Sequence, residues 1–255
     1  MTDPAPIDEN AGFRQSSYEL YVDWKGWRPF SYGADEADSF RGELGRDDLS
    51  GLCLLEIGFG AGNFLAWAMD RGAQIVGAEA NPQSRDIAAA RGVELLPADL
   101  GAAVEANRDR FDYILAFDVF EHMTLPQIVA GLNHCAAMLK PDGALLLRFP
   151  NAQSPFGQAP QYADVTHVTP LSGEQLVQLS LGTPLEVVAA RGAHRPRGRG
   201  LARRAVRLVR YLLQDLVGLF VRFTFLSSAP IAPVMTVILK RRPSPTAGNA
   251  VRNQA

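Results

Sequence analysis

Four histidines are the candidates for proton transfer near neutral pH, and two of them follow acidic residues closely. His122 comes directly after Glu121, and His167 lies three positions after Asp164. An imidazole oriented by a carboxylate can take the proton of a hydroxyl group, as a general base does. We predict His167 as the base, with His122 and Asp164 in the same catalytic site. The alternative is that these side chains only cap a helix or fix a loop.

The same region could instead hold a metal ion. Asp118, Glu121 and His122 fall at positions i, i+3 and i+4, on one face if this segment is helical. His167 could complete a shell of carboxylate and imidazole ligands. We predict a site without a metal, and a divalent ion at these four residues stays open as the alternative.

A glycine-rich segment follows an apolar run near residue 52. It reads Glu56-Ile57-Gly58-Phe59-Gly60-Ala61-Gly62-Asn63, and a helical pattern begins at its end. Glycines at alternate positions let the backbone turn sharply and approach a ligand, and the helix that follows offers unpaired N–H groups. A dinucleotide fingerprint would place a third glycine where Asn63 stands, and a P-loop is excluded because no Gly-Lys-Ser or Gly-Lys-Thr occurs.

Acidic residues also end the next two apolar runs. Glu79 ends the second run, where a carboxylate can accept hydrogen bonds from both hydroxyls of a ribose. Asp99 follows the third run, where it could receive an adenine amino group. Each of these signals is weak alone, and together they predict a site for a nucleoside.

The elements that position these residues are short apolar runs that alternate with helical stretches. Continuous apolar strands with helices between them indicate a parallel sheet that is covered on both faces. We therefore predict a doubly wound, Rossmann-like α/β sheet of seven strands, with ligands at the carboxyl ends of the strands. The predicted strands are 52–57, 74–79, 93–96, 113–117, 144–149, 185–190 and 234–239, and the predicted helices are 34–44, 63–71, 82–91, 125–139 and 172–180, with a turn at 140–143.

These motifs resemble those of the class I S-adenosylmethionine-dependent methyltransferases. The resemblance rests on residues 56–62, Glu79, Asp99 and the segments 111–122 and 138–143, and it covers residues 50–190 together with the last strand. It implies S-adenosylmethionine as the cofactor and a sheet whose last strand is antiparallel. An NAD site, or the same fold without a ligand, is the alternative.

The resemblance also implies a role for each residue that matches a motif. The methionine part of the cofactor would lie along the glycine-rich segment, the ribose at the second strand end and the adenine after the third strand. In that order, the implied cofactor-binding residues are Glu56, Gly58, Phe59, Gly60 and Gly62, then Glu79 with Ala80 beside it, then Asp99 and Leu100, with Asp118 near the methionine end.

A strong charge asymmetry separates the last quarter of the chain from the rest. Residues 1–190 carry 12 basic and 26 acidic residues, whereas residues 191–255 carry 13 basic residues and one acidic residue, Asp215. From Leu201 the pattern is that of a helix with arginines on one face and leucines or phenylalanines on the other. We predict that residues 200–226 contact an anionic membrane surface. Self-association as a homo-oligomer is the alternative, and we expect no nucleic-acid partner.

The predicted organisation follows from these features. Residues 1–48 form an N-terminal arm with an aromatic and helical cap, 49–190 the methyltransferase core, 191–228 an Arg-rich amphipathic helical insertion, 229–242 the final core strand and 243–255 a disordered tail. The N-terminal residues lack the pattern of a signal peptide, so we expect a cytoplasmic protein, peripheral at the inner face of the membrane. Cys53 and Cys135 lie in apolar runs and are expected to be reduced.

A narrower resemblance concerns the methyl acceptor. The run 55–68, the loop 164–167 and the basic insertion are similar to methyltransferases of bacterial surface-polysaccharide assembly. This implies O-methylation of a sugar hydroxyl on a lipid-linked or surface polysaccharide. A small hydrophobic acceptor, such as a quinone precursor or lipid, and a non-catalytic scaffold protein stay open as alternatives. Related methyltransferases of small-RNA ribose and of ubiquinone precursors hold a divalent ion in comparable clusters, but this chain has a single histidine in the later loop.

Overall fold

The computed structural model describes residues 12, 26, 28–225 and 230–243. The predicted N-terminal arm, most of the aromatic part of the cap and the tail from residue 244 lie outside the described residues. Among the described residues the chain forms one sheet of seven strands in the order β3-β2-β1-β4-β5-β7-β6. The strands are β1 Cys53–Ile57, β2 Gln74–Ala78, β3 Glu94–Leu96, β4 Phe111–Phe117, β5 Leu139–Pro150, β6 Leu185–Gly192 and β7 Val234–Arg241.

The strand directions confirm the predicted fold class. β1 to β5 pair in parallel, and β7 pairs antiparallel with both β5 and β6. The strand order reverses between β1 and β4, which lie side by side in the sheet. In an open sheet of this kind, a crevice forms at the carboxyl ends of the two strands where the order reverses.

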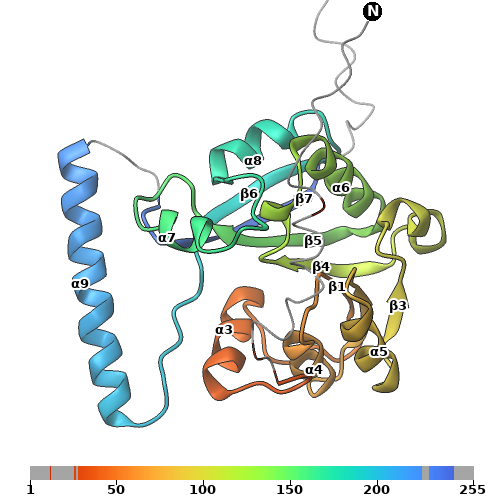
Figure 1. The fold of residues 1–255 in the computed structure, drawn as a ribbon, viewed down its shortest axis with the longest axis horizontal. Coiled ribbons are helices and arrows are strands. Elements are labelled where there is room, and N and C mark those ends of the chain that lie inside the picture. Colours follow the sequence, from red (N-terminus) through yellow and green to blue (C-terminus); the bar gives the residue numbers. More distant parts are fainter. Residues whose placement is uncertain (1–11, 13–25, 27, 226–229, 244–255) are drawn as a thin grey trace, which may run out of the picture.

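Helices cover both faces of the sheet. Figure 1 shows α3 Ala34–Leu44, α4 Asn63–Met69 and α5 Pro82–Ala90 on one face, and α6 Leu125–Met138 and α8 Gly173–Ser180 on the other. The inward side chains form two separate apolar clusters. Strands that are buried on both sides need apolar residues at successive positions, which is why β1 reads as the uninterrupted buried run Cys-Leu-Leu-Glu-Ile with a single acid.

Two segments differ from the prediction. The turn predicted at residues 140–143 lies within β5, whose pairing with β4 shifts register between Phe111 and Tyr113. The backbone is crowded at this irregularity, since a Cβ on Gly143 would lie 2.9 Å from the carbonyl oxygen of Phe111. The loop after β5 contains a short helix, α7 Gln158–Tyr162, which the proline-rich and glycine-rich sequence there did not predict.

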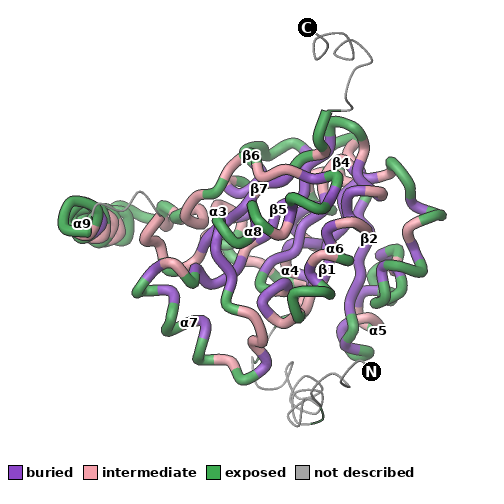
Figure 2. Tube along the Cα trace, turned by 90° about the horizontal axis from the view of Figure 1, so that it is seen from above, coloured by how far each residue is buried: buried purple, intermediate pink, exposed green. Residues whose placement is uncertain are grey.

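The basic insertion forms the helix α9 Leu201–Phe225, which stands away from the rest of the fold (Figure 1). Figure 2 shows that almost the whole helix is exposed, and Gly218 is its one buried residue. Within the part of the chain that the structure describes, no helix has both the length and the apolarity needed to cross a bilayer.

Candidate functional site

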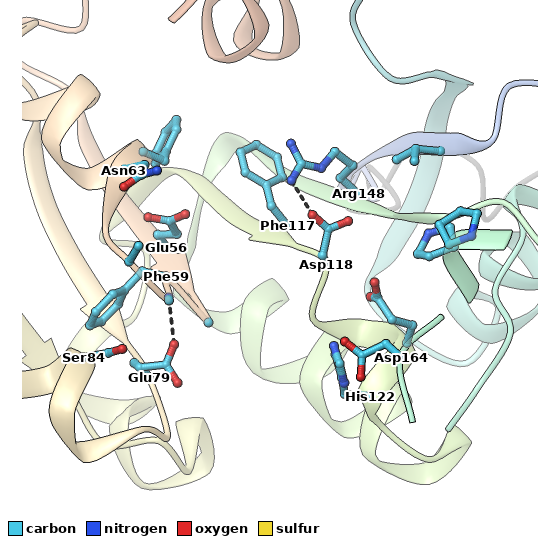
Figure 3. Close-up of a pocket in the computed structure, with 18 of the residues that line it drawn as sticks. Glu56, Phe59, Asn63, Glu79, Ser84, Phe117, Asp118, His122, Arg148 and Asp164 are labelled. Carbon is cyan, nitrogen blue, oxygen red and sulfur yellow. Dashed lines mark hydrogen bonds and ion pairs between the residues drawn. The ribbon is translucent and has the colours of Figure 1, made fainter. Parts of the chain in front are cut away.

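A cavity of about 530 Å³ opens at the carboxyl ends of the central strands. Its walls come from the glycine-rich loop after β1, from the ends of β2, β4 and β5, and from the segment around α7. Figure 3 shows two groups of polar side chains in it, with Glu56, Asn63 and Glu79 on one side and Asp118, Arg148 and His122 on the other. The cavity therefore brings together residues that lie far apart in the sequence.

The glycine-rich loop is packed too tightly for side chains at two of its glycines. Gly58 has φ +65°, and a Cβ there would lie 2.5 Å from a methyl carbon of Val119. Gly62 has φ +73°, and a Cβ there would lie 2.6 Å from the ring of Phe30. Both values of φ fall in the left-handed region that favours glycine. Gly58 and Gly60 line the cavity, whereas Gly62 serves the packing of the loop against Phe30 at the start of α4.

Glu79 is buried at the end of β2 and is held by the backbone. Its Oε1 accepts hydrogen bonds from the backbone N–H groups of Ala80 at 2.7 Å and Asn81 at 2.9 Å. Its Oε2 accepts one from the N–H of Gly60 at 2.9 Å, which ties the carboxylate to the glycine-rich loop (Figure 3). A carboxylate has about four acceptor positions, so Oε2 keeps capacity for one more donor in the cavity.

Two buried oxygen atoms on the same side of the cavity lack a hydrogen-bond donor among the described residues. They are Oε2 of Glu56 and Oδ1 of Asn63. The amide nitrogen of Asn63 donates to Glu36 at 3.0 Å, which leaves its oxygen unsatisfied. Burial raises the pKa of Glu56 well above its usual range, and the nearby Arg148 acts against this shift. A buried oxygen without a donor costs free energy of folding, and a donor or a cation that enters the cavity would remove this cost.

Asp118 and Arg148 form an ion pair on the other side of the cavity. Asp118 follows β4 with φ +59°, a strained conformation for a residue with a side chain, and its backbone N–H donates to the carbonyl oxygen of Arg148 at 2.8 Å. The Arg148 guanidinium lies 4.6 Å from the ring centre of Phe117. Burial by itself would lower the pKa of Arg148. The ion pair with Asp118 outweighs this effect, so the net pKa of Arg148 is raised. Arg148 was not among the residues predicted from the sequence, although it is the one cation in the apolar run 144–149.

His122 and His167 lie together, as predicted, with their ring centres 4.6 Å apart. Nδ1 of His167 lies 2.8 Å from the carbonyl oxygen of Gln161, and Nδ1 of His122 lies 3.1 Å from that of Thr166. A carbonyl oxygen can only accept, so in each neutral ring Nδ1 carries the proton. In His167 this leaves Nε2 as the ring nitrogen that can take up a proton.

The surroundings of the two rings differ. Burial lowers the pKa of His122, and the neighbouring His167 adds to this effect. Asp164 reaches His122 through Thr166, whose hydroxyl donates to Asp164 at 2.6 Å and lies 3.0 Å from Nδ1 of His122. The predicted carboxylate thus helps to orient an imidazole, with a threonine between the two.

Glu121 completes this cluster. It is fully buried, neither of its carboxylate oxygens has a hydrogen-bond donor among the described residues, and burial raises its pKa, with the negative charge of Asp118 as a further cause. Its Oε1 lies 3.9 Å from Nε2 of His167. Ligand atoms of Glu121, His122 and His167 all lie within 4.8 Å of one another. This donor set of one carboxylate and two imidazoles suits a divalent transition metal, while Asp118 is engaged by Arg148.

Four predicted cofactor-binding residues lie outside the cavity lining: Gly62, which packs against Phe30, and Ala80, Asp99 and Leu100. Asp99 is exposed and accepts a hydrogen bond from the N–H of Gly101 at 3.0 Å, so it caps the turn η1 Leu100–Ala103. Leu100 is buried in the core. Ala80 contributes its N–H to Glu79. The adenine-binding role of Asp99 and Leu100 stays a prediction.

Comparison with known proteins decides the family. A family model described as a methyltransferase domain matches residues 31–190. The chain is a member of the S-adenosylmethionine-dependent methyltransferase family. The fold of this methyltransferase resembles that of a SAM-dependent methyltransferase from Archaeoglobus fulgidus, with a TM-score of 0.56, 16% identity, and 89% of this chain and 99% of that chain covered. It also resembles the 1,6-didemethyltoxoflavin-N1-methyltransferase from Burkholderia thailandensis, which was solved with bound S-adenosylhomocysteine, with a TM-score of 0.55, 15% identity, and 96% and 93% covered.

Curated relatives match a shorter part of the methyltransferase. It is 38% identical over 105 residues to a ubiquinone biosynthesis O-methyltransferase of Rhodopseudomonas palustris strain HaA2, which covers 39% of this chain and 40% of that protein. A protein of the same name from Bradyrhizobium sp. strain ORS 278 is 39% identical over 109 residues, with 39% and 40% covered. The match therefore spans 40% of the length of these relatives. The comparisons confirm the predicted family and cofactor, and they leave the acceptor open.

The residues on the first side of the cavity fit S-adenosylmethionine. The two unsatisfied oxygens of Glu56 and Asn63 are suited to the ammonium group of its methionine part. The remaining acceptor capacity of Glu79 is suited to a ribose hydroxyl.

Proposed function

We propose that this protein transfers a methyl group from S-adenosylmethionine to a hydroxyl group of an amphiphilic acceptor. The observation that carries the proposal is the division of the cavity: unsatisfied acceptors for a cationic cofactor lie on one side, and the imidazole of His167, with an accepting Nε2, lies on the other beside His122. A cavity of about 530 Å³ is within the range of small-molecule sites.

When bound, S-adenosylmethionine supplies a methyl group on a positively charged sulfur, which an oxygen nucleophile displaces in line. The protein contributes mainly by holding the acceptor in position. His167 removes the hydroxyl proton at Nε2, and the carbonyl oxygen of Gln161 holds the ring in the required tautomer. We favour His167 over His122 as the base because the lowered pKa of His122 makes that ring a weaker proton acceptor.

A metal-dependent form of the same reaction is the second candidate, and the cluster of Glu121, His122 and His167 supports it. A divalent cation held there would lower the pKa of a bound hydroxyl group. Titration of chelator-treated protein with Mn²⁺ or Zn²⁺, followed by calorimetry, separates the two candidates. Stoichiometric binding that is lost in Glu121→Gln favours the metal, and turnover that persists in the chelator favours the histidine base.

Two classes of amphiphilic molecule could serve as the methyl acceptor. The curated relatives are named for ubiquinone biosynthesis, which supports a small hydrophobic acceptor. A sugar hydroxyl on a lipid-linked glycan is the second class, and it is supported by the arginines Arg195 and Arg210, which could pair with the phosphate of a lipid carrier. Both classes agree with a peripheral position of α9 on an anionic membrane, which co-sedimentation with phosphatidylglycerol vesicles tests.

The decisive experiment uses a cofactor with a labelled methyl group. The protein is incubated with membrane extracts, and the labelled fraction is separated into quinone precursors, lipids and glycans. His167→Ala should lower the transfer rate by about 100-fold or more, with the affinity for S-adenosylhomocysteine unchanged, whereas His134→Ala in α6 should transfer as the wild type does. The proposal of an enzyme fails if neither form of the cofactor binds, and the role of His167 fails if the His167→Ala variant keeps full activity.

A further inference from the structure

The insertion that carries α9 leaves and re-enters the sheet beside the catalytic cavity. β6 ends at Gly192, which pairs with Met235, and β7 begins at Val234, which pairs with Pro150 at the carboxyl end of β5. Val234 lines the catalytic cavity. The helix is therefore connected to the sheet beside the carboxyl end of β5, next to the cavity that the acceptor must enter.

The helix α9 approaches the rest of the protein with its polar side. Arg207 forms an ion pair with Asp35 of α3 at 2.5 Å, and the Tyr211 hydroxyl donates to the carbonyl oxygen of Pro196 at 2.9 Å. Gly218 is buried against Ile231. The leucines and phenylalanines of the opposite side are left exposed, and Figure 1 shows that the helix stands apart from the rest of the fold. This is the reverse of the usual arrangement, in which a helix packs through its apolar side.

A second cavity lies between α9 and the edge of the sheet. It has a volume of about 840 Å³, and its walls are mostly apolar. On the helix side they include Val206, Val209, Leu213 and Val217, whose exposed fractions run from 44% to 69%, so protein side chains do not fill the groove. On the sheet side Val234 lines both this groove and the catalytic cavity, which makes the two spaces adjacent.

The charges around the groove favour an anionic amphiphile as the occupant. Arg195 and Arg210 line it, and none of its lining residues is acidic. Arg195 pairs with Asp215, whereas Arg210 forms no ion pair with any residue that the structure describes. A second copy of α9 would bring arginine against arginine in this space, and such like-charge contact is unfavourable.

We infer that this groove binds the hydrocarbon chain of the methyl acceptor, an amphiphile with an anionic group near its head. The inference rests on the proposed methyl transfer for the identity of the ligand. The chain lies along the valines and leucine of α9, Arg210 meets the anionic group, and the hydroxyl-bearing end passes Val234 into the cavity with the histidines. Acceptors with long chains are thereby selected over short ones.

The test measures chain binding without any need for turnover. Dimethylallyl, geranyl and farnesyl monophosphate are titrated by calorimetry into the full chain, and S-adenosylhomocysteine is titrated in parallel. The affinity should rise by at least about tenfold from the shortest chain to the longest. The groove variant Val209→Glu with Leu213→Glu should lose this gain, because it places carboxylates where the chain lies. The matched control, Leu208→Glu with Leu212→Glu, alters the outer face of the same helix, outside the groove lining, and should keep the gain.

Three results would overturn the inference. The first is equal affinity for all three chains, and the second is a groove variant that binds farnesyl monophosphate as the wild type does. The third is a wild-type dimer in light scattering that the groove variant, but not the control, converts to a monomer, because a second copy would then occupy the groove. The parallel titration keeps the two proposals apart. If the wild-type protein does not bind S-adenosylhomocysteine, the proposed methyl transfer is refuted. If it binds S-adenosylhomocysteine but shows no preference for longer chains, only the proposed role of the groove is refuted.

Discussion

Replacing Glu79 by glutamine tests the placement of the cofactor ribose with little change in shape. The wild-type carboxylate accepts three backbone N–H groups, two at Oε1 and one at Oε2, and it has one acceptor position left for a ribose hydroxyl. The glutamine can keep an oxygen toward Ala80 and Asn81 only by turning its NH₂ group toward Gly60 and the cavity. The charge-assisted bond to the ribose is then lost, which is worth about 1.5–3 kcal/mol.

This loss corresponds to a rise in Kd of about 10- to 100-fold. Calorimetric titration with S-adenosylhomocysteine measures it, and thermal unfolding of the same sample shows that the variant is folded. The matched control is Glu94→Gln on β3, which removes a carboxylate outside the cavity that pairs with Arg110. An unchanged Kd in a folded Glu79→Gln variant would refute the assignment of this carboxylate to the ribose.

Two further predictions concern stability. Gly58→Ala should lower the free energy of unfolding, measured by urea denaturation, by about 1–3 kcal/mol, because the new Cβ would meet Val119 and a φ of +65° disfavours a side chain. Adding Val119→Ala removes the clash but not the strained φ, so the double variant should regain only part of the lost stability. Glu56 has a raised pKa in the folded state, so the folded protein binds more protons than the unfolded chain, and stability falls as the pH rises above about 4.5. Glu56→Gln should therefore be more stable than the wild type at pH 7 by about 1 kcal/mol or more. Urea denaturation measures this difference in the free energy of unfolding, which should vanish toward pH 4. The same difference at both pH values would contradict the raised pKa of Glu56.

The strand ends were predictable because the sequence pattern itself determines them. A buried parallel strand needs consecutive apolar residues, so the polar residue that follows marks the carboxyl end where ligands bind. This argument predicted correctly that Glu79 and the glycine-rich loop lie at one cavity. The same argument placed Asp99 near the adenine, and this role stays a prediction. Its side chain lies outside the lining of this cavity and caps the following turn, a local contact that strand periodicity does not show.

The partners of Arg148 could not be predicted in the same way. Its contact with Asp118 depends on the register of β4 and β5, in which Phe117 pairs with Arg148. Register is a property of two strands that are separated by a helix, and one strand read alone does not contain it. The proximity of His122 and His167 needed no register to predict, because both lie in loops after the carboxyl ends of parallel strands, and such loops meet above the sheet.

The direction in which α9 faces was also beyond the sequence pattern. Helical periodicity predicts two faces, but it does not say which one turns toward the protein. That choice follows from the acidic residues of α3. Asp35 pairs with Arg207, and the side chains of Asp38 and Glu43 accept hydrogen bonds from the backbone N–H groups of Arg197 and His194 in the segment before the helix. The basic insertion is held by these contacts through its polar groups, which leaves the apolar side outward.

This arrangement separates the choice of acceptor from the binding of the cofactor. Of the carboxylates that fit the cofactor, Glu56 lies in β1 and Glu79 directly follows β2. The segment that joins the insertion to β7 lies at the far side of the cavity, which Val234 lines, and Asn151 and Ser154 hydrogen-bond to the backbone of residues 230–232 there. A change on α9 can therefore alter which acceptor reaches the histidines while Glu56 and Glu79 keep their geometry. Acceptor specificity in this protein is then expected to follow the sequence of the insertion, and cofactor affinity to follow the ends of the first two strands.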